Sequence, residues 1–275
     1  MADNQTVQAY TDAWTHAIES VSELVAPLPE GQWNRATECP GWSVRDVVSH
    51  VIAMECELLG DPRPIHPLPR DLRHVTSEFT RYCEVPVDKR RCHTAPEMTA
   101  ELEYTVIRRS RALRNAKHGP DDEVRLPLGP FSRQVPYREL LRHRAFDVWV
   151  HEQDLRRALG QPGHLGSPGA LVASDLLVEG LPKVVARRAG APAGSTVAVE
   201  VHGAVEFACA VRVDAGGRGV LEEQVPPAPT VRLTTDWETY ARLACGRIRP
   251  GTAPVKVEGD EELGRRILEH FSVTP

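Results

Sequence analysis

The chain lacks the features of several common protein classes. Its 275 residues include no apolar run near the ~18 to 20 residues that a membrane-spanning helix needs. The first residues, MADNQTVQAY, lack the basic start and apolar core of a signal peptide. A formal net charge of -5 offers no basic excess for nucleic acid or an anionic membrane. We therefore expect a cytoplasmic protein, a monomer or homodimer, with no nucleic-acid and no membrane partner.

The cysteines show no pattern typical of a disulfide framework. The six of them, at positions 39, 56, 83, 92, 209 and 245, show no CxxC spacing, which favours reduced thiols over disulfides or a structural zinc site. Charged residues make up 26% of the chain and hydrophobic residues 41%, proportions that are typical of a soluble globular protein. The length suits two modest domains or one large one.

The first half of the sequence predicts a helical bundle. Apolar residues recur at helical spacing over residues 6–25, 43–60, 96–117 and 136–159. Ser43 is a candidate N-cap that accepts a hydrogen bond from the amide of Asp46, and Gly160 is placed to end the last of these helices. Residues 61–74 contain four prolines and predict a surface loop, whereas residues 75–94 stay ambiguous. The long connection favours a bundle with a crossover.

The second half changes pattern after GQPGHLGSPG at residues 160–169. A helix is expected at about residues 170–189, followed by β-rich runs, a helix from Asp236, a further run and a last helix to Phe271; the runs are STVAVEV, FACAVRVD, TVRLTT and PVKVEG. Mixed segments of this kind indicate an α+β domain. The predicted fold class is thus a two-domain α+β protein, with a helical bundle over residues 1–162 and a smaller α+β domain over residues 163–275.

The stretch FDVWVHEQD at residues 146–154 places two polar side chains on the apolar side of a helix. Asp147 and His151 are four residues apart and therefore stand over one another. A carboxylate on a buried face is costly unless it is paired or binds a metal. In one interpretation, Arg144 pairs with Asp147, which also accepts a hydrogen bond from His151. In the other, Asp147 and His151 hold a divalent ion together with a third ligand.

His50 is the candidate for that third ligand. It lies on the inner side of the helix that starts at Ser43, and a single histidine there is more often a core or rim residue. Together with Asp147 and His151, however, it supplies a ligand from a facing helix, which is how helical bundles build metal sites. Asp154 has two interpretations, because it either orients the His151 imidazole or pairs at the surface with a neighbouring arginine.

Two pairs of motifs carry a resemblance to a known family. CPGWSVRDVVSHV, at residues 39–51, followed by FDVWVHEQDLRRALG, at residues 146–160, resembles the N-terminal half of the mycothiol-dependent maleylpyruvate isomerase family. That half is a branch of the DinB-like four-helix metal proteins. VRLTTDWETYARLACGRI and VKVEGDEELGRRIL are similar to the family's C-terminal domain, which resembles sterol carrier protein 2. The resemblance covers nearly the whole chain.

The resemblance implies a metal site and a thiol co-substrate. It implies that His50, the acid at position 147 and His151 bind a divalent metal, usually zinc, with a position left open for mycothiol or a similar low-molecular-weight thiol. Asp147 stands where the isomerase pattern has glutamate, which leaves the substrate open. Arg247, in ACGRI, matches an arginine that helps to hold the anionic substrate; alternatively, Gly246 ends a helix and Arg247 is its charged exit.

The expected function is therefore a metal-dependent, mycothiol-type transferase that activates a thiol as its thiolate for addition to a small electrophile. The alternatives are a maleylpyruvate-type cis-trans isomerase and a non-catalytic protein that binds a small molecule or lipid. Because an incoming thiol makes a protein nucleophile unnecessary, Cys39 is expected to be a turn residue.

Overall fold

The computed structural model describes residues 2–274, with side chains from Thr6 onward. The chain divides into two compact units, residues 1–163 and 164–275, which are described separately. The first is helical and the second, smaller one contains a sheet, so the predicted α+β fold class is confirmed. Within the described residues, no helix is long and apolar enough to cross a membrane.

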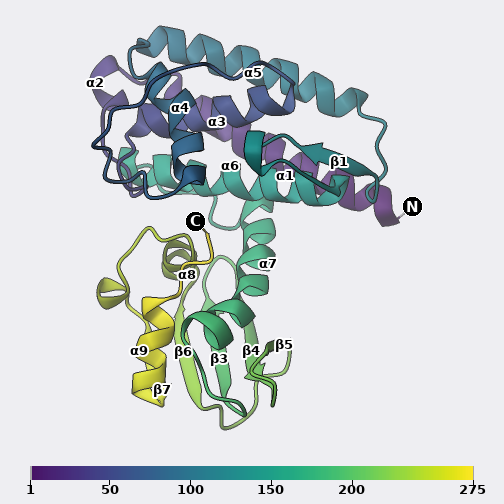
Figure 1. Cartoon of the computed structure of the whole chain (residues 1–275), viewed down its shortest axis with the longest axis vertical. Coiled ribbons are helices and arrows are strands. Elements are labelled where there is room, and N and C mark those ends of the chain that lie inside the picture. Colours follow the sequence, from purple (N-terminus) through teal and green to yellow (C-terminus); the bar gives the residue numbers. More distant parts are fainter. Residues whose placement is uncertain (1, 275) are drawn as a thin grey trace. The chain divides into compact units, whose positions relative to one another are not determined.

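The first unit is a bundle built around four long helices (Figure 1). Its elements are α1 (Ala2–Val25), α2 (Glu30–Trp33), α3 (Val44–Leu58), α4 (Glu78–Arg90), α5 (Ala95–Asn115), the hairpin strands β1 (Glu123–Leu126) and β2 (Arg133–Pro136), and α6 (Tyr137–Leu159). Helix α1 packs along α6, while α3 contacts α4, α5 and α6. This arrangement places the inner faces of α3 and α6 opposite each other.

Local signals set the ends of the two helices that matter most for the site. The Ser43 side chain accepts a hydrogen bond from the Asp46 amide, and the Asp46 carboxylate accepts one from the Ser43 amide, which confirms the predicted cap of α3. Gly160 ends α6 in the left-handed conformation, at φ 67°. Residues 61–74 contain no helix or strand, and the ambiguous region includes α4.

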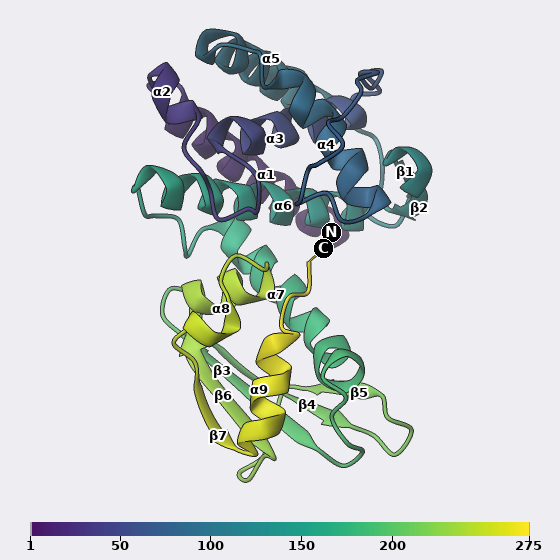
Figure 2. The same cartoon turned by 60° about the vertical axis from the view of Figure 1, so that its left-hand side comes forward.

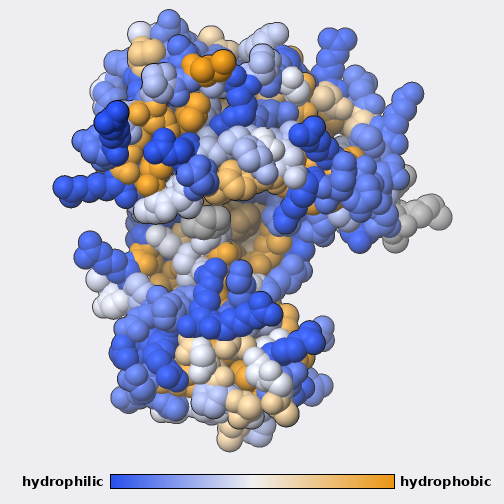
Figure 3. Space-filling model, in the orientation of Figure 1, coloured by the Kyte–Doolittle hydropathy of each residue, from blue (hydrophilic) through white to orange (hydrophobic). Residues whose placement is uncertain are grey.

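The bundle buries both apolar and charged side chains. Trp14, Ile18, Trp33 and Trp149 are among its largest fully buried residues. Each buried methylene contributes roughly 0.8 kcal/mol, so the burial of these large side chains contributes to the stability of the bundle. The face of the bundle seen in Figure 3 is mostly hydrophilic, with smaller apolar areas between the charged side chains.

The second unit is a five-stranded sheet with helices packed on it (Figure 2). It contains α7 (Pro168–Lys183), β3 (Thr196–His202), β4 (Phe207–Val213), β5 (Gly219–Glu222), β6 (Val231–Asp236), α8 (Trp237–Ala244), β7 (Lys256–Gly259) and α9 (Glu261–Glu269). The strand order is β5-β4-β3-β6-β7, in which only β3 and β6 pair in parallel. Trp237, Tyr240 and Leu177 are fully buried in its core.

Candidate metal centre

The three side chains predicted as metal ligands come together between α3 and α6. His50 Nε2 lies 3.5 Å from Asp147 Oδ2, and His151 Nε2 lies 3.8 Å from Asp147 Oδ1. One possible ligand atom from each residue lies within 4.8 Å of the other two. Ligand atoms of a tetrahedral zinc site, bound at ~2.1 Å, are ~3.4 Å apart. Small side-chain movements would therefore bring these three donors to coordination distances.

Each imidazole presents Nε2 toward Asp147. The Nδ1 atom of His151 lies 3.1 Å from Asp154 Oδ2, so a proton on Nδ1 can be donated to that carboxylate and Nε2 keeps its lone pair. Burial lowers the pKa of His50, which favours its neutral form. The His50 and His151 ring centroids are 4.9 Å apart. Both rings are therefore placed to act as neutral nitrogen ligands.

Asp154 is fully buried, and the interpretation as a surface residue is wrong for that reason. Its Oδ1 nevertheless accepts a hydrogen bond from Arg157 Nη2 at 3.2 Å, while Oδ2 faces His151. The position follows from the helix, since residues three apart on α6 are neighbours. Asp154 thus contacts the imidazole and an arginine at once.

Asp147 is held by a chain of ion pairs. Arg144 Nη1 lies 2.6 Å from Asp147 Oδ2, and Arg144 Nη2 lies 2.8 Å from Glu55 Oε1. Burial opposes ionisation of Asp147, but the Arg144 guanidinium outweighs it and holds the pKa of that carboxyl well below its usual range. The predicted ion pair is therefore present alongside the convergence with both histidines. The distance of 3.8 Å between His151 and Asp147 is too long for the predicted hydrogen bond.

Trp42 covers the two imidazoles. Its ring centroid is 5.1 Å from that of His50 and 6.0 Å from that of His151. Trp42 Nε1 donates to Glu84 Oε2 at 2.9 Å, and Glu84, which is fully buried, also contacts His74 at 2.9 Å. Sequence reasoning missed Trp42 and Glu84. The signal available was the tryptophan that ends the Cys-Pro-Gly-Trp turn.

The turn before Trp42 requires its glycine. Gly41 has φ 79°, and a Cβ atom there would lie 2.3 Å from the ring of His74. A side chain at this position would therefore be strained and would displace the loop that carries His74. Cys39 lies half-buried in this turn, as expected for a turn residue.

Family models match both units. The model of the mycothiol maleylpyruvate isomerase N-terminal domain matches residues 14–156, and the model of the corresponding C-terminal domain matches residues 172–266. The chain belongs to the mycothiol-dependent maleylpyruvate isomerase family. This is a family of enzymes, and the resemblance noted in the sequence is confirmed.

Two solved structures share the fold. Crystal structures of the mycothiol-dependent maleylpyruvate isomerase and of a histidine-to-alanine mutant of it match with TM-scores of 0.57 and 0.58. Each is 16% identical in sequence, and the match covers 92% of this chain and 92% of that chain. No curated protein is similar enough to count as a match.

Arg247, the residue carried over from the family's C-terminal domain, lies just after α8. Gly246 has φ 67° and follows the helix, which matches the helix-exit interpretation of this segment. The Arg247 Nη1 atom donates to the carbonyl of Cys245 at 2.8 Å. A role of Arg247 in binding the substrate stays a prediction.

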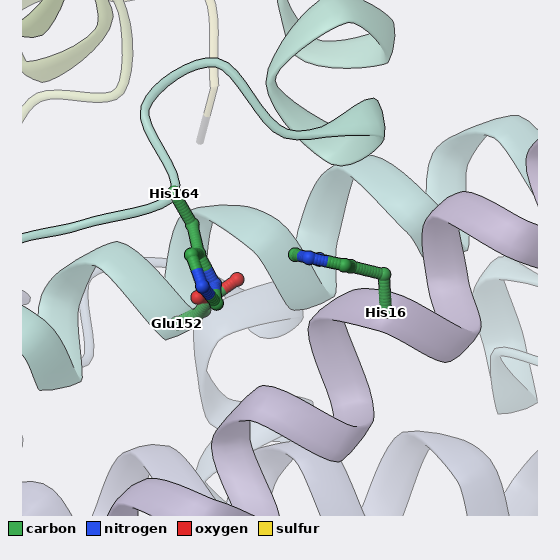
Figure 4. Close-up of side chains that lie close together, drawn as sticks. All are labelled: His16, Glu152 and His164. Atoms are coloured by element: carbon green, nitrogen blue, oxygen red, sulfur yellow. The ribbon is translucent and has the colours of Figure 1, made fainter.

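Two further side chains of the bundle that could bind a metal, His16 of α1 and Glu152 of α6, were not predicted from the sequence. Figure 4 draws them, along with His164 of the second unit. Within the bundle, Glu152 Oε1 already accepts hydrogen bonds of 2.7 Å from Ser20 Oγ and from Arg156 Nε. This carboxylate is thus engaged by an arginine, as Asp147 is.

None of the six cysteines forms a disulfide. Burial raises the pKa of Cys56, and it raises the pKa of Cys83 to about 12 and that of Cys209 to about 11. A raised pKa lowers the thiolate fraction, which makes these three cysteines poor nucleophiles near neutral pH. These three cysteines are therefore poor candidates for a catalytic nucleophile.

Proposed function

We propose that this chain is a metal-dependent enzyme that uses mycothiol, or a similar low-molecular-weight thiol, to isomerise a small anionic electrophile at an activated double bond. The observation that carries the proposal is the convergence of His50, Asp147 and His151 in a chain of this family. Family membership favours isomerisation over the S-transfer that the sequence placed first. Maleylpyruvate is accordingly the first substrate to test.

The donor set suits a divalent ion. Two neutral imidazoles and one carboxylate are ligands that zinc binds readily, and they leave a coordination position open. A free thiol has a pKa of ~8.5 and is mostly protonated at neutral pH. When bound, the ion would supply the positive charge that stabilises its thiolate form. The metal is proposed from the donor set, and zinc is the first choice.

The residues around the three donors would orient them. Arg144 engages one oxygen of Asp147, and Asp154 would keep the Nδ1 proton of His151 in place so that Nε2 stays available. Trp42 covers both rings on one side and limits the access of water there. We further propose that Arg247 binds a carboxylate of the substrate, because a guanidinium matches a carboxylate with two parallel hydrogen bonds.

The isomerisation consumes no proton and needs no oxidant or reductant. The thiolate sulfur forms a C–S bond with one carbon of the double bond, and the π electron pair moves onto the conjugated carbonyl oxygen as an enolate. Rotation occurs about the new single bond. The electron pair then returns, the C–S bond breaks, and the thiolate leaves with the alkene in the other geometry. The thiol is regenerated in every cycle.

S-transfer is the second candidate, and Asp147 is the observation in its favour, since the isomerase pattern has glutamate there. In that reaction the enolate is protonated on carbon and the C–S bond remains, so one thiol is consumed for each product.

The two functions are separated by thiol stoichiometry. Protein purified without added metal should contain about one divalent ion per chain. With thiol at one hundredth of the concentration of maleylpyruvate, an isomerase would convert nearly all of the substrate, whereas a transferase would stop when the thiol is used up. Isomerisation at the same rate without thiol would overturn both. A dependence on a low-molecular-weight thiol, like cysteines that form no disulfide, suits the reducing cytoplasm.

A further inference from the structure

A cavity separate from the candidate metal centre lies in the bundle, beneath the β1–β2 hairpin. Its volume is about 520 Å³, and its walls come from the ends of α3 and α5, the hairpin and the start of α6. Leu58, Arg109, Ala112, Tyr137 and Leu140 are among the lining residues. None of the three candidate metal ligands is among them. The volume falls within the ~300 to 1,000 Å³ range of small-molecule sites.

Two largely buried side chains that carry hydrogen-bond donors border this cavity. Arg109 is 7% exposed and Tyr137 is 6% exposed. Arg109 Nε donates to Glu55 at 3.0 Å, but within residues 6–274 neither Nη atom of Arg109 nor the Tyr137 hydroxyl has a hydrogen-bond partner. Burial raises the pKa of Tyr137, and the positive charge of Arg109 partly opposes this. Both side chains line the same cavity. None of these donor atoms is among the fully buried atoms without a partner, so they are open to the cavity and can bond an acceptor there.

The charges around the cavity favour an anion as that acceptor. Glu55 is the one carboxylate that pairs with Arg109 within the described part of the chain, and Glu55 also pairs with Arg144. Asp147 pairs with Arg144 in turn, so the two guanidiniums and the two carboxylates of this network balance. Glu55 contacts Arg109 only at Nε, which leaves the two Nη groups as cationic donors for a ligand. On the hairpin, Arg125 and Glu123 both line the cavity and offset each other. The cationic donors available at the wall are thus those of Arg109.

The rest of the wall is largely apolar. Leu58 and Leu140 flank the polar end, and Ala112 leaves space where a larger side chain would fill the cavity. Val124 and Pro127 of the hairpin extend this surface. A wholly polar anion such as inorganic phosphate would leave these side chains without contacts. An anion with a hydrocarbon body would bury them and gain about 25 cal/mol per Å² of apolar surface removed from water.

We propose that this cavity binds a small organic acid, with its carboxylate on Arg109 and Tyr137 and its hydrocarbon part against Leu58, Ala112 and Leu140. The site is independent of the proposed reaction, because it shares no lining residue with the candidate metal centre. A guanidinium and a phenol present several donors to two carboxylate oxygens, and hydrogen bonds to a charged acceptor are about twice as strong as neutral ones.

A matched pair of probes tests the proposal. 3-Phenylpropanoate and its neutral amide, 3-phenylpropanamide, would each be titrated calorimetrically into the full chain, both as purified and after removal of metal. The acid should bind at least about tenfold more tightly than the amide, and equally well in both preparations, since charge complementarity carries the difference. His50→Ala should leave this affinity unchanged, because His50 does not line the cavity.

Three variants locate the bound acid. Ala112→Phe should fill the cavity and abolish binding, whereas Ile107→Phe, which adds bulk to the exposed side of the same helix, should keep it. Tyr137→Phe removes one hydroxyl and should weaken binding about three- to tenfold. Tyr137→Phe also decides the matter if Ala112→Phe fails to fold, as judged by circular dichroism.

Several results would overturn the proposal. Equal affinities for acid and amide would remove the role of Arg109. Affinity that is unchanged in Tyr137→Phe, or in a folded Ala112→Phe, would place the acid elsewhere. Binding that requires metal and is lost in His50→Ala would assign it to the candidate metal centre. No saturable binding below about 10 mM, equivalent to about -2.7 kcal/mol, would leave the cavity without a ligand of this class.

Discussion

The two units bury different kinds of polar side chain. In the bundle, Glu55, Glu84 and Asp154 are fully buried, and each contacts a cation or an imidazole. In the described part of the second unit, the buried polar side chains are serines and threonines around an apolar core. A buried charge costs several kcal/mol unless its partners compensate it. Charges are therefore not needed to build a core. Their concentration in the bundle favours this unit as the place of the proposed chemistry.

Removal of a candidate ligand should produce the largest effect and is the strongest test of that contrast. His151→Ala should reduce the metal content from about one ion per chain to a small fraction. Turnover should fall by more than the roughly 10- to 100-fold typical of outer contacts, because a direct ligand is lost. Elemental analysis and steady-state rates give the two measurements.

His143→Ala is the matched control, because His143 is exposed and lies on the same helix. It should keep both metal and activity. Full retention of metal in a folded His151→Ala would show that the metal is not bound by His50, Asp147 and His151. The buried charges of the bundle would then matter only for its stability.

Glu55 provides the next largest effect, this time on stability. Glu55→Gln leaves Arg109 and Arg144 buried with much less compensation, so the free energy of unfolding should fall by about 3 to 5 kcal/mol. Ser174→Ala, in the second unit, should change it by less than about 1 kcal/mol. Urea unfolding followed by circular dichroism measures both. Similar effects in the two variants would contradict the contrast.

The contribution of Glu55 should also depend on pH. Burial opposes ionisation of Glu55, but Arg144 and Arg109 together lower its pKa below the ordinary value of 4.5. The stabilisation is therefore complete above pH 4.5 and is lost as the pH falls below that value toward the folded-state pKa. Glu55→Gln should lose less stability than the parent between pH 5 and pH 3, which thermal unfolding would detect.

The sequence predicted that His50, Asp147 and His151 converge, but it did not predict which side chains surround them. Helical periodicity shows which residues share an inner face, and their motifs resemble a family. Their role as metal ligands stays a prediction. Glu55 was not found. It lies 54 residues from Arg109 and 89 from Arg144, and no local pattern relates residues so far apart. Partners of buried charges are fixed by packing between helices.

The same comparison shows which elements were missed. Helix α4 contains Pro86, which weakens the helical pattern, yet Ser77 and Thr80 cap it and five of its residues are buried. Strand β5 and the β1–β2 hairpin, which have four residues per strand, were not predicted. Strand β7 is equally short, but its run PVKVEG was predicted, so length alone does not explain the misses. The longer runs that became β3, β4 and β6 were found, since each buries several apolar residues.

Arg247 tests whether the second unit takes part in substrate binding. If it does, Arg247→Lys should lower kcat/KM for an acidic electrophile by about 30- to 1000-fold, or ~2 to 4 kcal/mol. The reason is that lysine cannot form the bidentate contact with a carboxylate. Metal content should not change. Arg249→Lys, at an exposed arginine two residues on, is the control. Activity within about twofold of the parent would make Arg247 only the charged exit of α8.

Asp154 tests whether a buried carboxylate that contacts a candidate ligand, His151, affects metal binding. In Asp154→Asn the His151 Nδ1 proton loses its charged acceptor, so metal affinity should fall by about 10- to 100-fold. Competition with a chelator measures this affinity directly. An affinity equal to that of the parent, with an equally stable fold, would show that Asp154 serves Arg157 rather than the imidazole.

The smallest effect is expected for the cysteines, a reactive residue type that both units bury. Cys56→Ser and Cys39→Ser should each leave turnover within about twofold of the parent, because the proposed nucleophile is an external thiol. Burial raises the pKa of Cys56, and its sulfur contacts the Thr105 hydroxyl at 3.8 Å, so little thiolate forms there. Mass spectrometry of the protein during turnover checks the mechanism independently of rate. A substrate adduct that builds up on Cys39 or Cys56, and disappears as product forms, would replace the external thiol with a protein nucleophile.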